Sequence, residues 1–102
     1  MAYAWIQDVP IGEETYRRIA ERIGDEPLDG NLVHLAIRNE DGTLRYIDVW
    51  ESREQCDRAF DERIHPAVWA VLTEAGLRPG GEPPRREVDV VDLRGTPAGA
   101  PR

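Results

Sequence analysis

The chain has 102 residues, and its 13 basic residues against 20 acidic ones leave a net charge of −7. This length predicts a single domain, and the acidic surplus argues against a nucleic-acid partner, because binding phosphates needs a basic face. All 13 basic residues are arginine, which excludes Schiff-base chemistry on lysine, and the lone Cys56 excludes an intrachain disulfide.

The sequence contains no apolar run long enough to span a membrane and no signal-peptide-like hydrophobic segment near Met1. We therefore expect no membrane partner. A single cysteine fits a reducing compartment, so the expected location is cytoplasmic. Abundant Arg, Ala, Gly and Pro without Lys is typical of a bacterium with a GC-rich genome.

The first elements are predicted to be a strand and a helix. Residues 2–9 are rich in aromatic and β-branched side chains and stop at Pro10, which favours a strand. Residues 12–24 carry Glu13 and Glu14 in the first turn and end in Gly24, which is typical of a helix. The apolar face of this helix is made of Tyr16, Ile19, Ala20 and Ile23.

A hairpin follows, because residues 31–39 and 43–50 alternate around Glu40-Asp41-Gly42. A two-residue turn would place Tyr46 and Asp48 on the face of the aliphatic side chains. A three-residue loop with a left-handed Gly42 separates the two sets, and we favour it because register follows the hydrophobic pattern. One face then carries Val33, Leu35, Ile37, Ile47 and Val49, and the other carries Leu32, His34, Ala36, Leu44, Tyr46, Asp48 and Trp50.

A long second helix is predicted to begin at Ser52, where Ser52 and Gln55 form a capping-box pattern, and to end at Gly76. Pro66 should kink or break it at 64–66 and push His65 out of helical geometry. The apolar stripe of this helix is Cys56, Phe60, Ile64, Val68, Val71, Leu72 and Ala75.

Residues 87–93 form the last predicted strand, and residues 95–102 a flexible tail behind a single domain of residues 1–94. The order strand, helix, hairpin, helix, strand predicts an α+β, ferredoxin-like βαββαβ fold, with a four-stranded antiparallel sheet and both helices on one face.

The other face of the sheet is expected to carry Leu32, Leu44, Tyr46 and Trp50. This face would be too apolar to leave in water. We therefore predict a homodimer that forms through the open sheet face.

The sequence resembles the dimeric α/β-barrel superfamily, and within it proteins similar to antibiotic-biosynthesis monooxygenases. The resemblance covers residues 2–94 and rests on the hairpin with His34, on residues 48–52 (Asp-Val-Trp-Glu-Ser), on Phe60 and on residues 64–67 (Ile-His-Pro-Ala). It implies the dimeric fold and a range of activities: cofactor-free oxygenation, polyketide cyclisation, haem degradation, or none known. In this superfamily the ligand cavity often lies between sheet and helices.

His34 and Asp48 lie opposite each other in the favoured register, and Cβ atoms in such pairs are about 4.5–5.5 Å apart. The aspartate would fix the imidazole tautomer and make a usable base, with Tyr46 as a phenol donor and Trp50 as an aromatic wall. Such a group could deprotonate a phenolic or β-keto substrate. The structural alternative is an ion pair that only pins the dimer interface.

His65 is the second candidate, because the resemblance places the iron-binding histidine of haem-degrading relatives on this helix. Its neighbours do not reproduce that motif, and Gln7 stands where those enzymes carry asparagine, so we expect neither a cofactor nor a metal. His65 is then better explained as a residue at the helix break. Trp5, Gln7 and Trp69, with His65 and Trp50, could line a pocket for an aromatic substrate.

The predicted function is cofactor-independent oxygenation or cyclisation of a hydrophobic, aromatic or polyketide-like small molecule. His34 is the expected base, Asp48 its orienting partner and Tyr46 the donor. The alternatives are a non-catalytic dimeric module that only packs or binds a ligand and, less favoured, a haem-binding protein.

Overall fold

The computed structural model of the chain describes residues 2–77 and 81–95. Its elements are β1 (Tyr3–Val9), α1 (Glu13–Ile23), β2 (Asn31–Arg38), β3 (Leu44–Trp50), α2 (Arg53–Ala59), the π-helical turn η1 (Phe60–Ile64), α3 (His65–Glu74) and β4 (Arg86–Val88). This is the ferredoxin-like α+β order that the sequence predicts. The predicted tail lies, apart from Gly95, outside the described residues. None of the described helices could cross a lipid bilayer.

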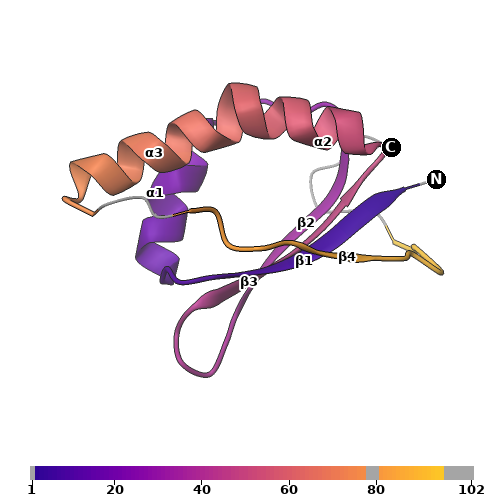
Figure 1. Ribbon diagram of the computed structural model, residues 1–102, viewed down its shortest axis with the longest axis horizontal. Coiled ribbons are helices and arrows are strands. Elements are labelled where there is room, and N and C mark those ends of the chain that lie inside the picture. Colours follow the sequence, from indigo (N-terminus) through magenta and orange to yellow (C-terminus); the bar gives the residue numbers. More distant parts are fainter. Residues whose placement is uncertain (1, 78–80, 96–102) are drawn as a thin grey trace.

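The four strands form one antiparallel sheet in the order β2-β3-β1-β4. All the helices lie on one side of this sheet, and the long helix made by α2, η1 and α3 runs across it (Figure 1). The prediction that both helices cover the same face is therefore confirmed.

The hairpin between β2 and β3 has the predicted three-residue loop. The N–H of Asn39 donates to the carbonyl of Thr43 at 2.8 Å, and Gly42 adopts a left-handed φ of 88°. In this register His34 lies opposite Asp48. An irregularity between Asn31 and Val33 gives β2 one extra residue near its beginning.

The helices cover the sheet face opposite to the predicted one, which corrects the expected dimer surface. Tyr46 and Trp50 lie beneath the helices, and Trp5 and Trp50 pack against Phe60 with ring centroids 5.7 and 6.3 Å apart. These three large rings bury most of their apolar area between the sheet and the helices. The open face instead carries the aliphatic set, with Leu35 and Ile37 48% and 44% exposed.

The second helix is not broken at the predicted 64–66, and its irregularity is the π-helical turn η1 (Phe60–Ile64) that directly precedes His65 and Pro66. Ser52 caps its beginning as predicted, since its hydroxyl accepts a hydrogen bond from the Gln55 N–H. Further along, the His65 N–H bonds to the Phe60 carbonyl five residues back, and His65 keeps helical angles of −58° and −44°. The wider turn before Pro66 thus accommodates the proline without ending the helix.

The last strand covers only Arg86–Val88, which is shorter than the predicted 87–93. It pairs with residues 4–6 of β1, and because the strands are antiparallel the chain after Val88 soon passes Tyr3, the first residue of β1. Val91 is accordingly 96% exposed.

Candidate functional site

Two adjoining cavities, the β2-side lobe and the β4-side lobe, lie between the covered sheet face and the helices. The β2-side lobe holds about 210 Å³ and is bordered by β2, β3 and α1, and the β4-side lobe holds about 500 Å³ and is bordered by β1, α3 and the segment before β4. Ile19, Tyr46, Phe60, Ile64 and Val68 line both lobes.

The β2-side lobe contains the predicted His34–Asp48 pair. Asp48 is on the inner strand β3 with its carboxylate almost fully buried, whereas His34 is on the edge strand β2 with about a third (35%) of its side chain exposed. The Nδ1 of His34 lies 3.1 and 3.0 Å from the two oxygens of Asp48. An ionised carboxylate can only accept, so the proton of the neutral imidazole is held on Nδ1 and Nε2 carries the lone pair.

Tyr16 completes this group, and the sequence analysis missed its role. Its Oη lies 2.8 Å from the Nε2 of His34, so the phenol donates to the imidazole. Burial, reinforced by the charge of Asp48, raises the pKa of Tyr16, so it stays protonated at neutral pH. The periodicity of α1 placed Tyr16 on the inward face but could not show that α1 sets it beside β2.

Tyr46 lies where the two lobes meet, beside the pair as predicted. Its ring centroid is 5.4 Å from that of His34 and 5.6 Å from that of Tyr16. Burial, with smaller effects from Tyr16 and Asp48, raises its pKa far above the ordinary value, so Tyr46 remains a phenol that can donate a hydrogen bond.

The predicted aromatic wall is partly wrong. Trp50 is completely buried against Phe60 and is not among the described residues that line either lobe. Trp5 does line the β2-side lobe and stands opposite Asp48 in the pairing of β1 with β3.

The other three predicted residues, Gln7, His65 and Trp69, line the β4-side lobe. Gln7 is 3% exposed, and its amide donates to the carbonyl of Pro83 at 2.8 Å, which holds the segment before β4 against β1. Trp69 is on the rim and is 62% exposed.

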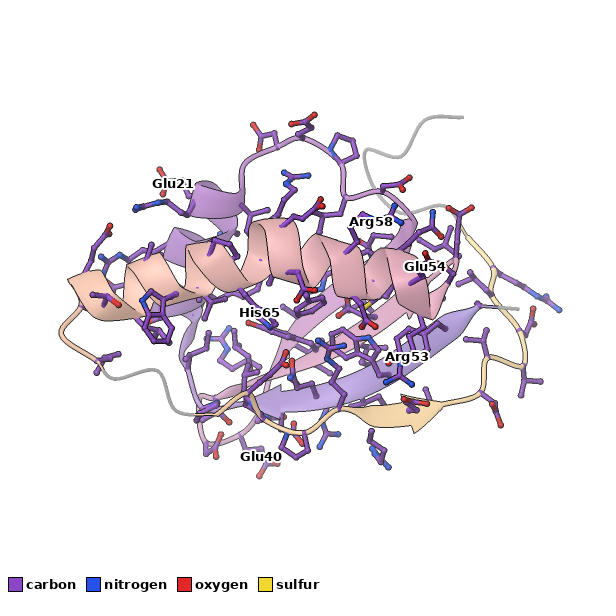
Figure 2. The ribbon with its side chains drawn as sticks, turned by 45° about the horizontal axis from the view of Figure 1, so that its top comes forward. Glu21, Glu40, Arg53, Glu54, Arg58 and His65 are labelled. Atoms are coloured by element: carbon purple, nitrogen blue, oxygen red, sulfur yellow. The ribbon has the colours of Figure 1, made fainter. Side chains whose placement is uncertain are left out.

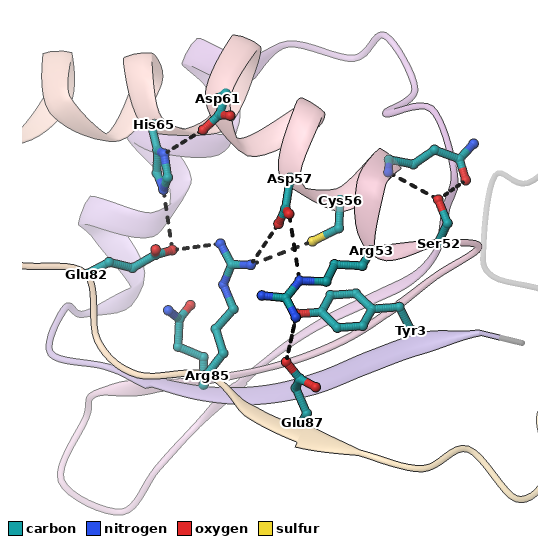
Figure 3. Close-up of polar contacts among 12 residues, drawn as sticks. Tyr3, Ser52, Arg53, Cys56, Asp57, Asp61, His65, Glu82, Arg85 and Glu87 are labelled. Carbon is teal, nitrogen blue, oxygen red and sulfur yellow. Dashed lines mark hydrogen bonds and ion pairs between the residues drawn. The ribbon is translucent and has the colours of Figure 1, made fainter.

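His65 projects from the long helix towards the segment before β4 (Figure 2 and Figure 3). Its Nε2 lies 3.4 Å from Glu82, and its Nδ1 lies 3.9 Å from Asp61. Both ring nitrogens therefore face carboxylates, which does not fit an axial ligand to haem iron. Among the described residues, no three side chains of His, Cys, Asp or Glu are grouped so that they could hold a metal ion.

Arg85 closes the outer side of this region (Figure 3). Its guanidinium lies 3.1 Å from Glu82 and stacks over the ring of Phe60 with 4.2 Å between the guanidinium carbon and the ring centroid. Burial alone would raise the pKa of Glu82, but Arg85 and His65 together lower it. The resulting cluster ties the segment before β4 to the long helix.

The walls of both lobes are mostly apolar, and their charged side chains are acidic: Glu26, Asp48 and Glu82. No arginine of the described ranges lines either lobe. The arrangement can therefore hold a neutral, largely aromatic molecule beside a hydrogen-bonded acid–base group.

The sequence matches no model of a known protein family and no curated protein. The fold is similar to that of a solved structure from Chloroflexus aurantiacus J-10-fl that carries the provisional name antibiotic biosynthesis monooxygenase. The two share 16% sequence identity with a TM-score of 0.61, and the match covers 93% of this chain and 98% of the other. This likeness establishes the ferredoxin-like fold.

Proposed function

We propose that this chain is a small-molecule enzyme that removes a proton from a neutral aromatic or polyketide-like substrate in the two adjoining lobes. The His34–Asp48 pair on the wall of an apolar cavity carries the proposal. His34 accepts the proton on Nε2, and the buried carboxylate of Asp48 stabilises the imidazolium that forms. The raised pKa of Tyr46 keeps its phenol protonated, so Tyr46 can donate a hydrogen bond to the enolate oxygen.

Proton abstraction is the step that cofactor-independent oxygenation and aldol-type cyclisation share. The enolate left in the cavity then reacts with molecular oxygen in the first case, or attacks a second carbonyl of the same substrate in the second. The name of the structural neighbour favours oxygenation. The acidic side chains in the walls disfavour an anionic substrate, because like charges in a desolvated site repel each other.

Hydrogen–deuterium exchange tests this function. The protein is incubated in D₂O with three neutral aromatic ketones that have acidic C–H bonds, namely 2-tetralone, anthrone and benzoylacetone, and exchange is followed by NMR. We expect the wild-type protein to accelerate exchange in at least one ketone, and we expect His34→Gln to lower this exchange rate by about 10²-fold. Glu54→Gln, which changes an exposed residue of α2 outside both lobes, is the control and should retain the activity. Lack of acceleration with all three ketones would contradict the proposal.

Ligand binding without catalysis is the second candidate, and one observation favours it. Both ring nitrogens of His34 are already hydrogen-bonded, to Asp48 and to Tyr16, as in a purely structural histidine. A thermal shift with the same ketones but no acceleration of exchange would support this candidate.

We also propose that two copies pair through the open sheet face. Leu35 and Ile37 are nearly half exposed there, and Val33 and Ile47, also on this face, are only partly buried. Such an aliphatic patch is typical of an interface, and a two-fold axis would cover it with its own copy.

Light scattering coupled to size-exclusion chromatography checks the pairing. The expected result is a dimer that becomes monomeric in Leu35→Asp. The matched control Leu77→Asp changes another exposed leucine, beyond the end of α3, and should leave the dimer intact. A monomeric wild-type protein would overturn the proposed pairing.

A further inference from the structure

We propose that Tyr16 is a catalytic residue that relays the substrate proton to His34. This inference rests on the proposed function, because it describes how the base reaches the substrate. Tyr16 lines the β2-side lobe, and its Oη lies 2.8 Å from Nε2.

The base cannot act directly while this contact stands. The lone pair of Nε2 already accepts the hydrogen bond of the Tyr16 phenol, and the proton on Nδ1 is bonded to Asp48. The hydroxyl oxygen of Tyr16 keeps free lone pairs of its own. It is therefore the atom of the Asp48–His34–Tyr16 chain that can receive a proton from a molecule in the lobe.

The geometry of the chain suits a concerted transfer. The Tyr16 proton moves to Nε2 as the C–H or O–H proton of the substrate moves to the Tyr16 oxygen. Tyr16 ends as a neutral phenol, His34 as an imidazolium bonded to Asp48, and the substrate as an enolate. One proton is gained by the enzyme and one is lost by the substrate, and a phenolate never accumulates. The arrangement parallels that of a Ser-His-Asp triad, with a phenol in place of the serine.

Aromatic packing holds the phenol in place. The rings of Tyr16 and His34 are stacked at an angle of 15° with centroids 6.0 Å apart, and Tyr46 packs against both. The competing interpretation is that Tyr16 merely covers the base and must move away. The fold supports this interpretation, because α1 packs chiefly against α3 and not against β2. Besides the Tyr16–His34 contact, α1 is joined to β2 by the exposed Glu13–Arg38 ion pair at 3.6 Å.

Tyr16→Phe separates the two interpretations, since it keeps the ring and removes the hydroxyl. Release of tritium from C1-tritiated 2-tetralone is measured, or from whichever of the three ketones the wild-type protein exchanges fastest. A relay predicts a loss of about 10²-fold, comparable to that of His34→Gln. A cover predicts an unchanged or faster rate, because Nε2 becomes free. Tyr3→Phe, which lies outside both lobes, is the matched control and should retain the rate.

The solvent isotope effect adds a measurement that loss of packing would not change. In the relay only the Tyr16 hydroxyl proton exchanges with solvent, because the hydrogen that leaves the ketone is bound to carbon. Tritium release by the wild type should therefore slow in proportion to the D₂O fraction, whereas the residual release by Tyr16→Phe should be nearly independent of it. A wild-type rate that does not change with the D₂O fraction would overturn the relay.

A measurement without substrate completes the test. In ¹⁵N NMR, His34 should be the Nδ1–H tautomer, and the Nε2 resonance should move when Tyr16→Phe removes its hydrogen bond. An Nε2–H tautomer would overturn the relay whatever the activity. If His34→Gln loses activity and Tyr16→Phe does not, only the relay fails. If the wild type accelerates exchange of none of the ketones, the proposed function fails, and the relay with it.

Discussion

The two faces of the sheet solve the same problem, covering apolar surface, in different ways. The covered face uses aromatic rings and encloses polar groups among them, with Trp5 and Asp48 directly opposite each other and both buried. The open face uses aliphatic side chains and an exposed ion pair, Asp8 with Arg45 at 2.8 Å. Large rings leave spaces between them that small molecules can enter, whereas flat aliphatic rows suit a second sheet. Chemistry is therefore expected on one face and association on the other.

The largest expected effect is a difference in the free energy of unfolding between variants of the two faces. Trp50→Ala removes a fully buried ring of the covered face and should lower the free energy of unfolding by about 3–5 kcal/mol. Leu35→Ala on the open face, compared with wild type at a protein concentration low enough for monomers, should cost far less. Urea denaturation followed by tryptophan-independent far-UV circular dichroism measures both. Equal losses would mean that the open face is also enclosed within one chain.

A smaller effect compares the His34–Asp48 pair of the covered face with the Asp8–Arg45 pair of the open face. Asp48→Ala should cost about 1–3 kcal/mol, because His34 loses its buried hydrogen-bond acceptor. Asp8→Ala should leave the urea midpoint nearly unchanged, since exposed pairs contribute little. Equal shifts of the urea midpoint in the two variants would contradict this expectation.

The smallest effect is a loss of stability in alkali that Tyr46 of the covered face causes. Its pKa is raised in the folded state, so its contribution to stability is complete below the unfolded value near 10 and is lost as the pH rises towards the folded value. The wild type should lose at most about 1.4 kcal/mol per pH unit from this group above about pH 10. Tyr46→Phe should show a shallower decline in urea midpoints between about pH 8 and about pH 11. Parallel declines would show that Tyr46 ionises freely.

The sequence predicted the order of elements along the chain, the hairpin register and the opposition of His34 and Asp48, because all of these follow from periodicity and turn chemistry. It predicted the wrong face for the helices. Alternation shows which side chains share a face, but the choice between faces depends on how rings such as Trp5 and Phe60 fit beneath the helices. The contact of Tyr16 with His34 depends on the packing of α1, which no spacing within either segment contains.

The length of β4 and the continuity of the long helix were also beyond local reasoning. The sequence of residues 87–93 has strand character throughout, yet its pairing stops opposite Ala4, next to the first residue of β1. Pro66 is a strong helix breaker by itself, but the turn before it widened instead.

That widened turn, η1, holds one residue more than an α-helical turn would. Each α-helical residue advances the side-chain direction by about 100°, so deleting a single residue within η1 would turn α3 about its axis by that amount relative to α2. Val68 would swing out of both lobes, and Trp69 would leave the rim. The shape of the ligand space thus depends on the number of residues along the helix as well as on which residues line it. A one-residue deletion in η1 would change specificity even though Val68 and Trp69 remain in the sequence.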